Sequence, residues 1–460
     1  MMYNDTIAAI ATALSHSGIS IIRISGSHAI EIADKIFVPA NPAKKLAASP
    51  TYTMHYGHIC FEGQVIDEVI VSIMRAPHSY TAEDVAEINC HGGILVTRKI
   101  LDAVISSGAR PAEAGEFTKR AFLNGRLDLA QAEAVIDIIN SQNEFALKSA
   151  ESQLGGLISE KIKEIRSSLL YEIAYIESAL DDPEHYPMEN YGQELAEKLH
   201  PLLSRMIRLR ESADDGLMLK EGIRTVILGK PNAGKSSLLN LMVGSDRAIV
   251  TDIAGTTRDT LEEMVQLEGI SLRIIDTAGI RQTDDLVEKI GVERAMEQAR
   301  KADLVLYVVD GTKALDEDDK EIIKCIAGKR TIILLNKSDL ETVLTEEDLR
   351  QMLPEQNYIT FSARNREGFE ELTDLIKELF FTQKLRYNDE VYLTSARHKA
   401  AVDAAISSIN LVLESIEAGM PEDFYTIDMM NAYEQLGMIT GETAREDLVN
   451  EIFGRFCMGK

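Results

Sequence analysis

The stretch Gly229-Lys230-Pro231-Asn232-Ala233-Gly234-Lys235-Ser236 decides the fold of the central part of this chain. It matches the pattern G-x-x-x-x-G-K-[ST], and it lies between a short apolar run at 224–228 and a helix-forming run at 237–243. In a strand, loop and helix of this kind, backbone N–H groups and the helix N-terminus surround phosphate oxygens. We therefore expect Lys235 to reach the β- and γ-phosphates of a nucleotide and the Ser236 hydroxyl to ligate Mg²⁺.

Three further motifs, each after a predicted strand, indicate which nucleotide is bound. Asp276-Thr277-Ala278-Gly279 follows the strand predicted at 272–275, and its carboxylate can hold the magnesium shell. Asn336-Lys337-Ser338-Asp339 follows the strand predicted at 331–335. The Asp339 carboxylate can accept two hydrogen bonds from guanine, a pair that adenine does not offer, and the backbone of Ser362-Ala363 can meet the guanine O6. In this order the motifs predict a guanine-nucleotide-binding domain.

The net charge of −26 over 460 residues limits how the chain can bind RNA. A chain this acidic repels phosphodiester backbones at long range. If the substrate is RNA, we therefore expect a more basic partner to contribute much of the binding affinity. The acidity is equally compatible with a role in solubility alone. The length predicts about two to four domains.

The sequence predicts a cytoplasmic protein. No apolar run approaches the roughly 20 residues of a membrane span, and the N-terminus lacks a basic leader, so we expect neither a membrane anchor nor a signal peptide. Cys60, Cys90, Cys325 and Cys457 show no paired or metal-like spacing, which suits a reducing compartment.

Helical patterns flank the nucleotide-binding domain on both sides. Before them, residues 1–120 predict an α+β domain with strands at 19–24, 52–74 (two strands) and 85–89 and helices at 27–37 and 92–106. After the nucleotide domain, helical patterning resumes at Ser395. We therefore expect the nucleotide domain to be inserted into one helical domain; two independent helical units are the alternative. The first helical stretch carries an apolar stripe at Leu154, Ile158, Ile162, Ile165, Leu169, Ile173, Ile176 and Leu180.

Two more stretches carry a resemblance to a known family. They are GEFTKRAFLNGRLDL at 115–129 and the C-terminal Phe456-Cys457-Met458-Gly459-Lys460. With the nucleotide motifs, they make the chain resemble the tRNA modification GTPase family MnmE (TrmE) from Asp5-Thr6-Ile7 to the last residue. The resemblance implies a multidomain fold: an N-terminal α+β tetrahydrofolate-binding-like domain, a discontinuous helical domain and an inserted P-loop, Ras-like G domain.

The resemblance also implies domain bounds and a function. The folate-binding and dimerisation domain would span 1–120, the helical domain 121–215 and 382–460, and the G domain 216–381. The family forms a homodimer and a heterotetramer with the flavoprotein MnmG. This complex adds a carboxymethylaminomethyl-type group to carbon 5 of the tRNA wobble uridine, using a one-carbon unit of 5-formyl- or methylene-tetrahydrofolate, and it requires GTP hydrolysis. A regulatory switch GTPase for ribosome assembly or signalling is the alternative; the separate α+β domain and the C-terminal motif favour the enzyme.

The hydrolysis site departs from that of many small GTPases. Directly after the DTAG motif they carry a Gln that orients the attacking water, and here Ile280 cannot do so. Gln282 is close in sequence, but the resemblance assigns the role to Glu288 as the catalytic residue. The charge on the β–γ bridge also requires neutralisation. Arg258 is one candidate for this, as an arginine finger, and the family uses K⁺ instead.

The resemblance assigns ligands residue by residue. K⁺ would contact Asn232, Thr251, Ile253 and Thr256, and Thr257 would join Ser236 on Mg²⁺. Two G domains would meet through these loops in a potassium-dependent way, which activates hydrolysis. The complete set expected to bind GTP is Asn232, Ala233, Gly234, Lys235, Ser236, Ser237, Thr251, Asp252, Ile253, Ala254, Gly255, Thr256, Thr257, Asp276, Thr277, Ala278, Gly279, Asn336, Lys337, Asp339, Ser362 and Ala363.

The folate site is also assigned by resemblance, to Arg23, Glu83, Arg126 and Lys460. A Glu carboxylate can pair with the N–H donors of a pterin, and cationic side chains suit the glutamate tail. Arg126 stands where the family commonly has Lys, which keeps the charge but not the geometry. Cys457, beside Lys460, is either a nucleophile with a lowered pKa or a small apolar plug in the helical domain.

Overall fold

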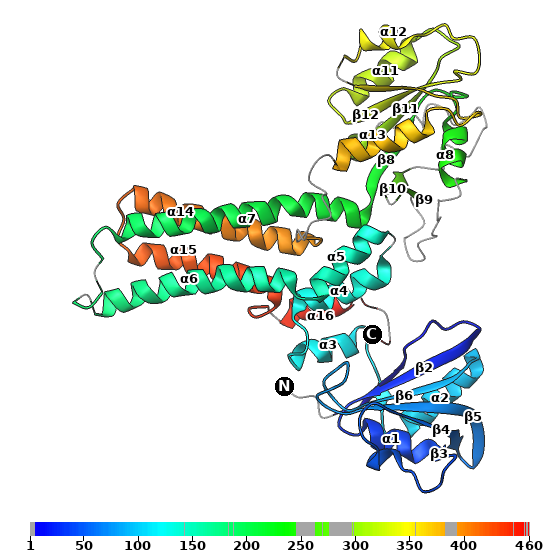
Figure 1. Cartoon of the computed structure of the whole chain (residues 1–460), viewed down its shortest axis with the longest axis vertical. Helices are drawn as coiled ribbons and strands as arrows, with labels where there is room; N and C mark the ends of the chain where they lie inside the picture. Colours follow the sequence, from blue (N-terminus) through cyan, green and yellow to red (C-terminus); the bar gives the residue numbers. More distant parts are fainter. Residues whose placement is uncertain are drawn as a thin grey trace. The chain divides into compact units, whose positions relative to one another are not determined.

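The computed structural model describes residues 5–141, 143–182, 184–186, 188–244, 263–268, 270–275, 297, 299–354, 356–381, 393–444, 446–454, 456 and 459 (Figure 1). The chain forms two compact units. The first unit comprises Met1–Ile139, Ala150–Met206 and Ala400–Lys460, and the second comprises Asn140–Ser149 and Ile207–Lys399.

The first unit begins with a seven-stranded sheet of order β3-β4-β5-β6-β2-β1-β7. Helices α1 (Ala29–Ile36) and α2 (Ile94–Ser106) cover one face, where they pack on alternate residues such as Ala86, Ile88 and Cys90. All strand pairs are antiparallel except β1 with β7. The strands are β1 (Ile7–Ile10), β2 (Ser17–Ser25), β3 (Phe37–Pro39), β4 (Thr53–Phe61), β5 (Gln64–Met74), β6 (Val85–Gly92) and β7 (Arg110–Pro111).

The strands and helices predicted in this domain are confirmed, but β1, β3 and β7 were not predicted. β1 consists of Ile7-Ala8-Ala9-Ile10 and is buried on both faces. Ala8 lies in the core under α1 and α2, whereas Ile7 and Ala9 pack with Phe117 on the other side. A strand covered on both faces does not show the alternation of apolar and polar residues by which we recognised the others.

Helices from distant parts of the sequence form the rest of the first unit. In it, α15 packs along α6 (Figure 1). The helices of this part are α3 (Glu116–Leu123), α4 (Leu129–Asn140), α5 (Glu144–Leu154), α6 (Leu157–Asp181), α7 (Tyr191–Glu221), α14 (Ala396–Glu417), α15 (Asp423–Thr440) and α16 (Glu446–Gly454). Of these, α5, α7 and α14, and α4 by its last residue, include residues of the second unit.

The predicted apolar stripe is confirmed in its middle and wrong at its ends. Its members from Ile158 to Ile176 are buried on α6. Leu154 instead ends α5, because Gly155-Gly156 separates the two helices and Gly156 has φ +91°. Leu180 is 49% exposed. A periodic pattern cannot show where a left-handed glycine interrupts a helix between two apolar positions.

The GEF run and the C-terminus meet in one small core. Gly115 precedes α3 with φ +69°, and a Cβ there would lie 2.5 Å from the Phe453 backbone oxygen on α16. Glycine is therefore required for the two helices to approach this closely. The buried apolar residues of this core, which α4 also lines, are Ala121, Leu127, Leu129, Ala132, Val135, Val449, Phe453 and Phe456.

The second unit contains a six-stranded sheet of order β13-β12-β11-β8-β10-β9. All its strand pairs are parallel except β9 with β10. The central strands are buried on both faces and read as continuous apolar runs, as parallel strands do. The strands are β8 (Ile223–Leu228), β9 (Glu263–Leu267), β10 (Ile270–Ile275), β11 (Leu304–Asp310), β12 (Thr331–Asn336) and β13 (Asn357–Thr360).

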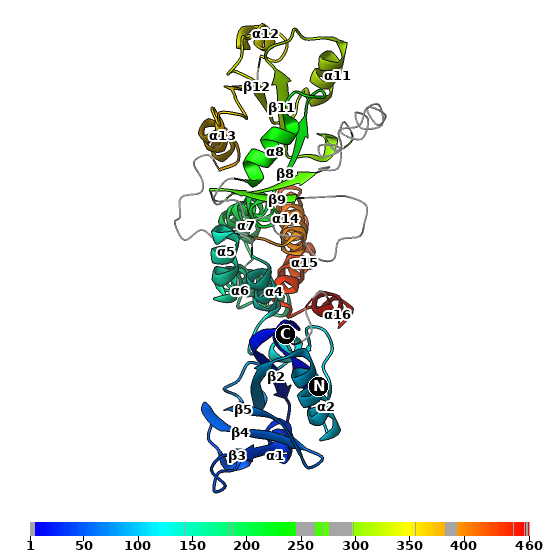
Figure 2. The ribbon, with the colours of Figure 1, turned by 90° about the vertical axis from the view of Figure 1, so that its right-hand side faces the viewer.

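Helices cover both faces of this sheet. α8 (Lys235–Val243) and α13 (Phe369–Phe381) pack on one face, and α11 (Glu317–Ile326) and α12 (Glu346–Arg350) pack on the other. Figure 2 shows α13 and α11 on opposite sides of the strands. β8 lies between β10 and β11. After β8 the chain adds β9 and β10 on one side of that strand, and later it adds β11, β12 and β13 on the other side. Ligands of open α/β sheets bind at such a switch point, beyond the carboxyl ends of the strands.

The predicted fold class is confirmed: an α+β domain, a helical domain assembled from separated segments, and an inserted P-loop domain. The domain bounds stay a prediction; α7 continues to Glu221, and β8 begins at Ile223. Among the described residues, no helix is both long and apolar enough to cross a membrane.

Replacement of Gly115 tests the packing of α3 on α16. Gly125 is a matched control, because its φ is +73° but a Cβ there would meet nothing within 4 Å. Both Gly→Ala changes carry the cost of a left-handed residue, and Gly115→Ala adds a clash with backbone. We expect Gly115→Ala to lower the free energy of unfolding by about 1–3 kcal/mol more than Gly125→Ala, measured by urea denaturation. Equal losses would contradict the close approach of the two helices.

Candidate functional site

The phosphate loop lies between β8 and α8, against the ends of two neighbouring strands. Gly229 has φ +146°, and a Cβ there would lie 2.3 Å from the Val308 oxygen on β11. Gly234 has φ +110°, and its Cβ would lie 2.0 Å from the side-chain amide nitrogen of Asn336, the last residue of β12. Both positions therefore require glycine. Asn232, between them, is also left-handed, with φ +60°.

Lys235 and Ser236 begin α8 at the end of this loop. The Lys235 ammonium donates to the Gly229 carbonyl at 2.6 Å and to the Lys230 carbonyl at 2.8 Å. The side chain therefore curls over the loop that it closes. A cation at a helix N-terminus lined with backbone N–H groups is suited to phosphate oxygens.

Asn336 joins the phosphate loop to the predicted base-binding loops. Its side-chain nitrogen donates to the Ala233 carbonyl at 2.7 Å, and its side-chain oxygen accepts from the Ala363 N–H at 3.1 Å. The Ser362 hydroxyl donates to Asp339 Oδ1 at 2.7 Å. Asn336 is buried, so these bonds are protected from water. The structure thus brings together the described members of the predicted GTP set: 232–237, Asn336, Lys337, Asp339, Ser362 and Ala363.

Asp310 is a residue of this site that the sequence analysis missed. Its carboxylate accepts from Lys337 Nζ at 2.7 Å and from the hydroxyl and N–H of Thr312. Burial raises the pKa of Asp310, but the bonds from Lys337 and Thr312 outweigh it and hold that pKa below its ordinary value. The signal was present in the sequence, because Asp310 ends a buried strand just as Asp276 was expected to.

Lys230 of the phosphate loop is likewise held by two carboxylates. Its ammonium lies 2.8 Å from Asp316 and 2.5 Å from Asp319. Asp316 caps the N-terminus of α11, and Asp319 accepts from the buried Tyr307 hydroxyl at 2.9 Å. The loop is therefore tied to α11 as well as to β12.

Many predicted site residues lie outside the described part of the chain. They include most of the expected Mg²⁺ and K⁺ ligands, the expected catalytic carboxylate and its alternatives, and two C-terminal residues. They are Thr251, Asp252, Ile253, Ala254, Gly255, Thr256, Thr257, Arg258, Asp276, Thr277, Ala278, Gly279, Gln282, Glu288, Cys457 and Lys460.

In the first unit, Arg23 and Arg126 lie against one aromatic ring. The guanidinium carbon of Arg23 is 5.2 Å from the centre of the Tyr80 ring, and that of Arg126 is 5.1 Å from it. Arg23 also donates to Glu87 Oε1 at 2.7 Å and reaches the Gly459 carbonyl at 3.5 Å. The C-terminal motif, at Gly459, thus contacts one of the predicted folate residues.

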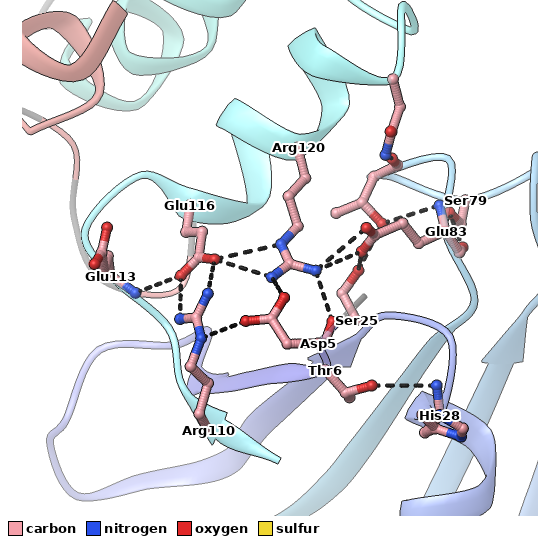
Figure 3. Close-up of polar contacts among 12 residues, drawn as sticks. Asp5, Thr6, Ser25, His28, Ser79, Glu83, Arg110, Glu113, Glu116 and Arg120 are labelled. Carbon is pink, nitrogen blue, oxygen red and sulfur yellow. Dashed lines mark hydrogen bonds and ion pairs between the residues drawn. The ribbon is translucent and has the colours of Figure 1, made fainter. Parts of the chain in front are cut away.

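Glu83 is held by a buried arginine that the sequence analysis missed (Figure 3). Arg120, which is fully buried, lies 3.2 Å from both Glu83 carboxylate oxygens. The Ser25 hydroxyl donates to Glu83 Oε2 at 2.8 Å. Arg120 also donates to Asp5 Oδ1 at 2.8 Å and to Glu116 Oε1 at 3.0 Å. One buried guanidinium group therefore pairs with three carboxylates.

Arg110 supplies the second positive charge of this cluster. It donates to Asp5 at 2.6 Å and to both Glu116 oxygens at 2.8 and 2.5 Å. Burial raises the pKa of the buried Glu116 carboxyl, but the hydrogen bonds from Arg110, the Glu113 N–H and Arg120 outweigh it, and the pKa lies below its ordinary value. The pKa of Asp5 is lowered in the same way by Arg110 and Arg120, against the effect of burial.

The chain was compared with known protein families and with their members. The family model "GTP-binding protein TrmE N-terminus" matches residues 6–126, and "MnmE helical domain" matches residues 129–457. The tRNA modification GTPase MnmE of Lachnoclostridium phytofermentans is 55% identical over 459 residues, with 100% of both chains covered. The chain belongs to the MnmE family of tRNA modification GTPases.

Other MnmE proteins match equally completely. That of Clostridioides difficile is 46% identical and that of Acetivibrio thermocellus 47% identical, each with 100% of both chains covered. Among solved structures, the G domain of the T. maritima FeoB iron transporter covers 34% of this chain and 97% of its own, at 23% identity and a TM-score of 0.26. Membership of the MnmE family makes the chain an enzyme, a GTPase.

Replacement of Glu116 tests the buried cluster. We expect Glu116→Gln to lower the free energy of unfolding by roughly 3 kcal/mol at pH 7, because two guanidinium groups lose a buried carboxylate. A carboxyl with a lowered folded-state pKa contributes stability above its unfolded pKa of about 4.3 and loses it as the pH falls through the folded-state value. The difference between wild type and variant, followed by urea denaturation, should therefore shrink below about pH 4.

Glu113→Gln is the matched control for this prediction, since Glu113 is exposed three residues away. We expect it to change stability little at any pH. A Glu116→Gln variant that behaves like this control would contradict the structural role of the cluster.

Proposed function

We propose that this chain is the GTP-hydrolysing component of the complex that adds a carboxymethylaminomethyl-type group to carbon 5 of the wobble uridine of tRNA. The observation that carries the proposal is the junction of phosphate and base loops through Asn336, in a chain that matches tRNA modification GTPases over its whole length. The relatives' names indicate tRNA as the substrate that is modified, and the geometry of the second unit supports the binding of a guanine nucleotide.

Hydrolysis would use metal ions held by oxygen donors. Ser236 at the first turn of α8 and Asn232 in the left-handed part of the loop offer a hydroxyl and an amide oxygen, which suit Mg²⁺ and K⁺ respectively. Thr257 would complete the magnesium ligands, and Thr251, Ile253 and Thr256 those of potassium. When bound, K⁺ supplies positive charge beside the β–γ bridge.

Glu288 would orient the attacking water, because Ile280 carries no polar group at the position that many GTPases use. Two G domains would meet through the potassium loops and so complete each site. This dependence of hydrolysis on association would couple GTP turnover to the state of the whole complex.

Folate would bind beside the buried cluster of the first unit. Glu83 is held by Arg120 and Ser25, and an ionised carboxylate in that place can accept from the N–H donors of a pterin. Arg23, Arg126 and Lys460 would face the carboxylates of the tail. The cofactor, 5-formyl- or methylene-tetrahydrofolate, would supply the one-carbon unit.

The partners would be a second copy of this chain, an MnmG-type flavoprotein in a heterotetramer, and tRNA in the cytoplasm. The homodimer is supported by the sheet face opposite α1 and α2. Exposed apolar side chains gather there on β2, β4 and β5, and Tyr56 stands opposite Ile70. They are Ile19, Met54, Tyr56 and Ile70, exposed by 63, 74, 53 and 43%. An apolar face of this kind favours a protein partner.

The GTPase rate in K⁺ and in Na⁺ at equal ionic strength tests the hydrolysis site. We expect the rate in K⁺ to be at least about tenfold higher, which corresponds to about 1.4 kcal/mol of the barrier. Glu288→Ala should lower kcat by about 100-fold or more, the usual contribution of a positioned acid–base group. Glu317→Ala is the control, because that carboxylate is exposed on α11.

Equal rates in the two salts would remove potassium from the proposal. Undiminished turnover in Glu288→Ala would remove that residue's catalytic role.

A further inference from the structure

Tyr80 lies at the centre of the predicted folate site, although no motif pointed to it. The guanidinium groups of Arg23 and Arg126 both lie over its ring, at 5.2 and 5.1 Å from the ring centre. The face of an aromatic ring is electronegative and attracts a cation by about 0.5–1 kcal/mol at exposed sites. One ring can therefore hold two like charges that would otherwise repel each other.

The ring is itself anchored in the fold. Its hydroxyl lies 2.9 Å from the hydroxyl of Thr118, a buried residue of α3. Its backbone carbonyl accepts from Arg126 at 2.9 Å, so Arg126 is held by both the ring and the main chain of the same residue. The position of Tyr80 thus fixes the direction in which Arg126 points.

The two cations differ in what neutralises them. Arg23 is paired with Glu87 at 2.7 Å. Arg126 is exposed, and among the residues that the structure describes no carboxylate lies within ion-pair distance of it. Arg126 therefore presents a positive charge to solvent, in a fixed place, beside the arginine that the C-terminal motif contacts.

The loop that carries Tyr80 also carries Glu83. The Ser79 hydroxyl donates to the Glu83 carbonyl at 2.5 Å, and the Thr81 hydroxyl lies 2.7 Å from that of Ser25. Asn124, two residues before Arg126, donates to the Thr81 carbonyl at 2.7 Å. These bonds hold the loop to β2 and to the end of α3. The distance between the Glu83 carboxylate and the two cations is therefore set by one short, fixed segment.

We infer that Tyr80 is a positioning residue for the folate site: its ring holds Arg23 and Arg126 where they meet the carboxylate-bearing tail of a folate whose pterin is bound by Glu83. The inference rests on the folate site of the proposed function. It adds to that site the residue that sets the spacing between its acidic and basic ends.

Titration of the full-length chain with 5-formyltetrahydrofolate tests the inference. Tyr80→Leu keeps an apolar side chain of moderate size but removes the ring face, so we expect the dissociation constant to rise about tenfold. Tyr80→Phe keeps the face and loses only the contact with Thr118, so we expect it to restore affinity to within about twofold of wild type. Tyr171→Leu is the control, since Tyr171 is 67% exposed on α6. Thermal melting of each variant reports whether the fold is intact.

A second readout separates positioning from general damage. Because ligand carboxylates and exposed cations attract each other less as salt increases, affinity of the wild type should fall with added KCl. Tyr80→Leu should show a shallower fall, because its Arg126 keeps only the main-chain bond to residue 80 and is held less firmly toward the ligand.

The outcomes distinguish the inference from the function on which it rests. A wild type that does not bind 5-formyltetrahydrofolate overturns the proposed folate site and the inference with it. A wild type that binds, with Tyr80→Leu binding equally well, overturns the role of Tyr80 and leaves the folate site standing. Equal weakening in Tyr80→Leu and Tyr80→Phe would show that the hydroxyl matters and not the ring face, which also overturns the inference.

Discussion

The first unit depends on a guanidinium group that has no access to water. Removal of an arginine from solvent costs several kcal/mol unless its charge and its N–H groups are satisfied. Arg120 meets that requirement with Asp5 from the N-terminus, Glu83 from the loop before β6, and Glu116 from its own helix. These three partners come from separate parts of the chain. Because all three must reach the same guanidinium group, the sheet, the loop and α3 are fixed relative to one another. The same arrangement holds Glu83, which lies on the loop that carries Tyr80.

The second unit uses a similar device at its nucleotide edge. Asn336, a buried amide, spans the gap between the phosphate loop and the loop that carries Ala363. Lys230 and Lys337 tie neighbouring parts of this edge to Asp316 and Asp310. A site whose loops are joined before any ligand arrives loses less entropy on binding, and its geometry is less tolerant of a wrong base. In both units, buried polar groups thus join separate segments of the chain beside the residues of a candidate site.

The sequence predicted the parts of each site that are contiguous and missed those that are assembled by long-range contacts. The phosphate loop and the NKSD motif lie at the ends of β8 and β12, and the apolar runs of these strands mark where they end, so both loops could be located from the sequence. Arg120 meets Asp5 across 115 positions and Glu83 across 37, and no local spacing reports such a pair. Tyr80 was missed because it contacts two arginines that come from other parts of the chain. β1 was missed because both its faces are covered, and Leu154 was wrongly assigned to the α6 stripe because Gly155 and Gly156 separate α5 from α6.

The most direct test of the central claim is mass spectrometry of tRNA nucleosides from a strain that lacks this chain. We expect carboxymethylaminomethyl-type wobble uridines to disappear, to return with the wild-type chain, and not to return with Lys235→Ala, which lacks the ammonium group that we expect to hold the nucleotide phosphates. Wobble uridines that are unaltered in the deletion strain would contradict a role in tRNA modification, whatever the chain's rate of GTP hydrolysis.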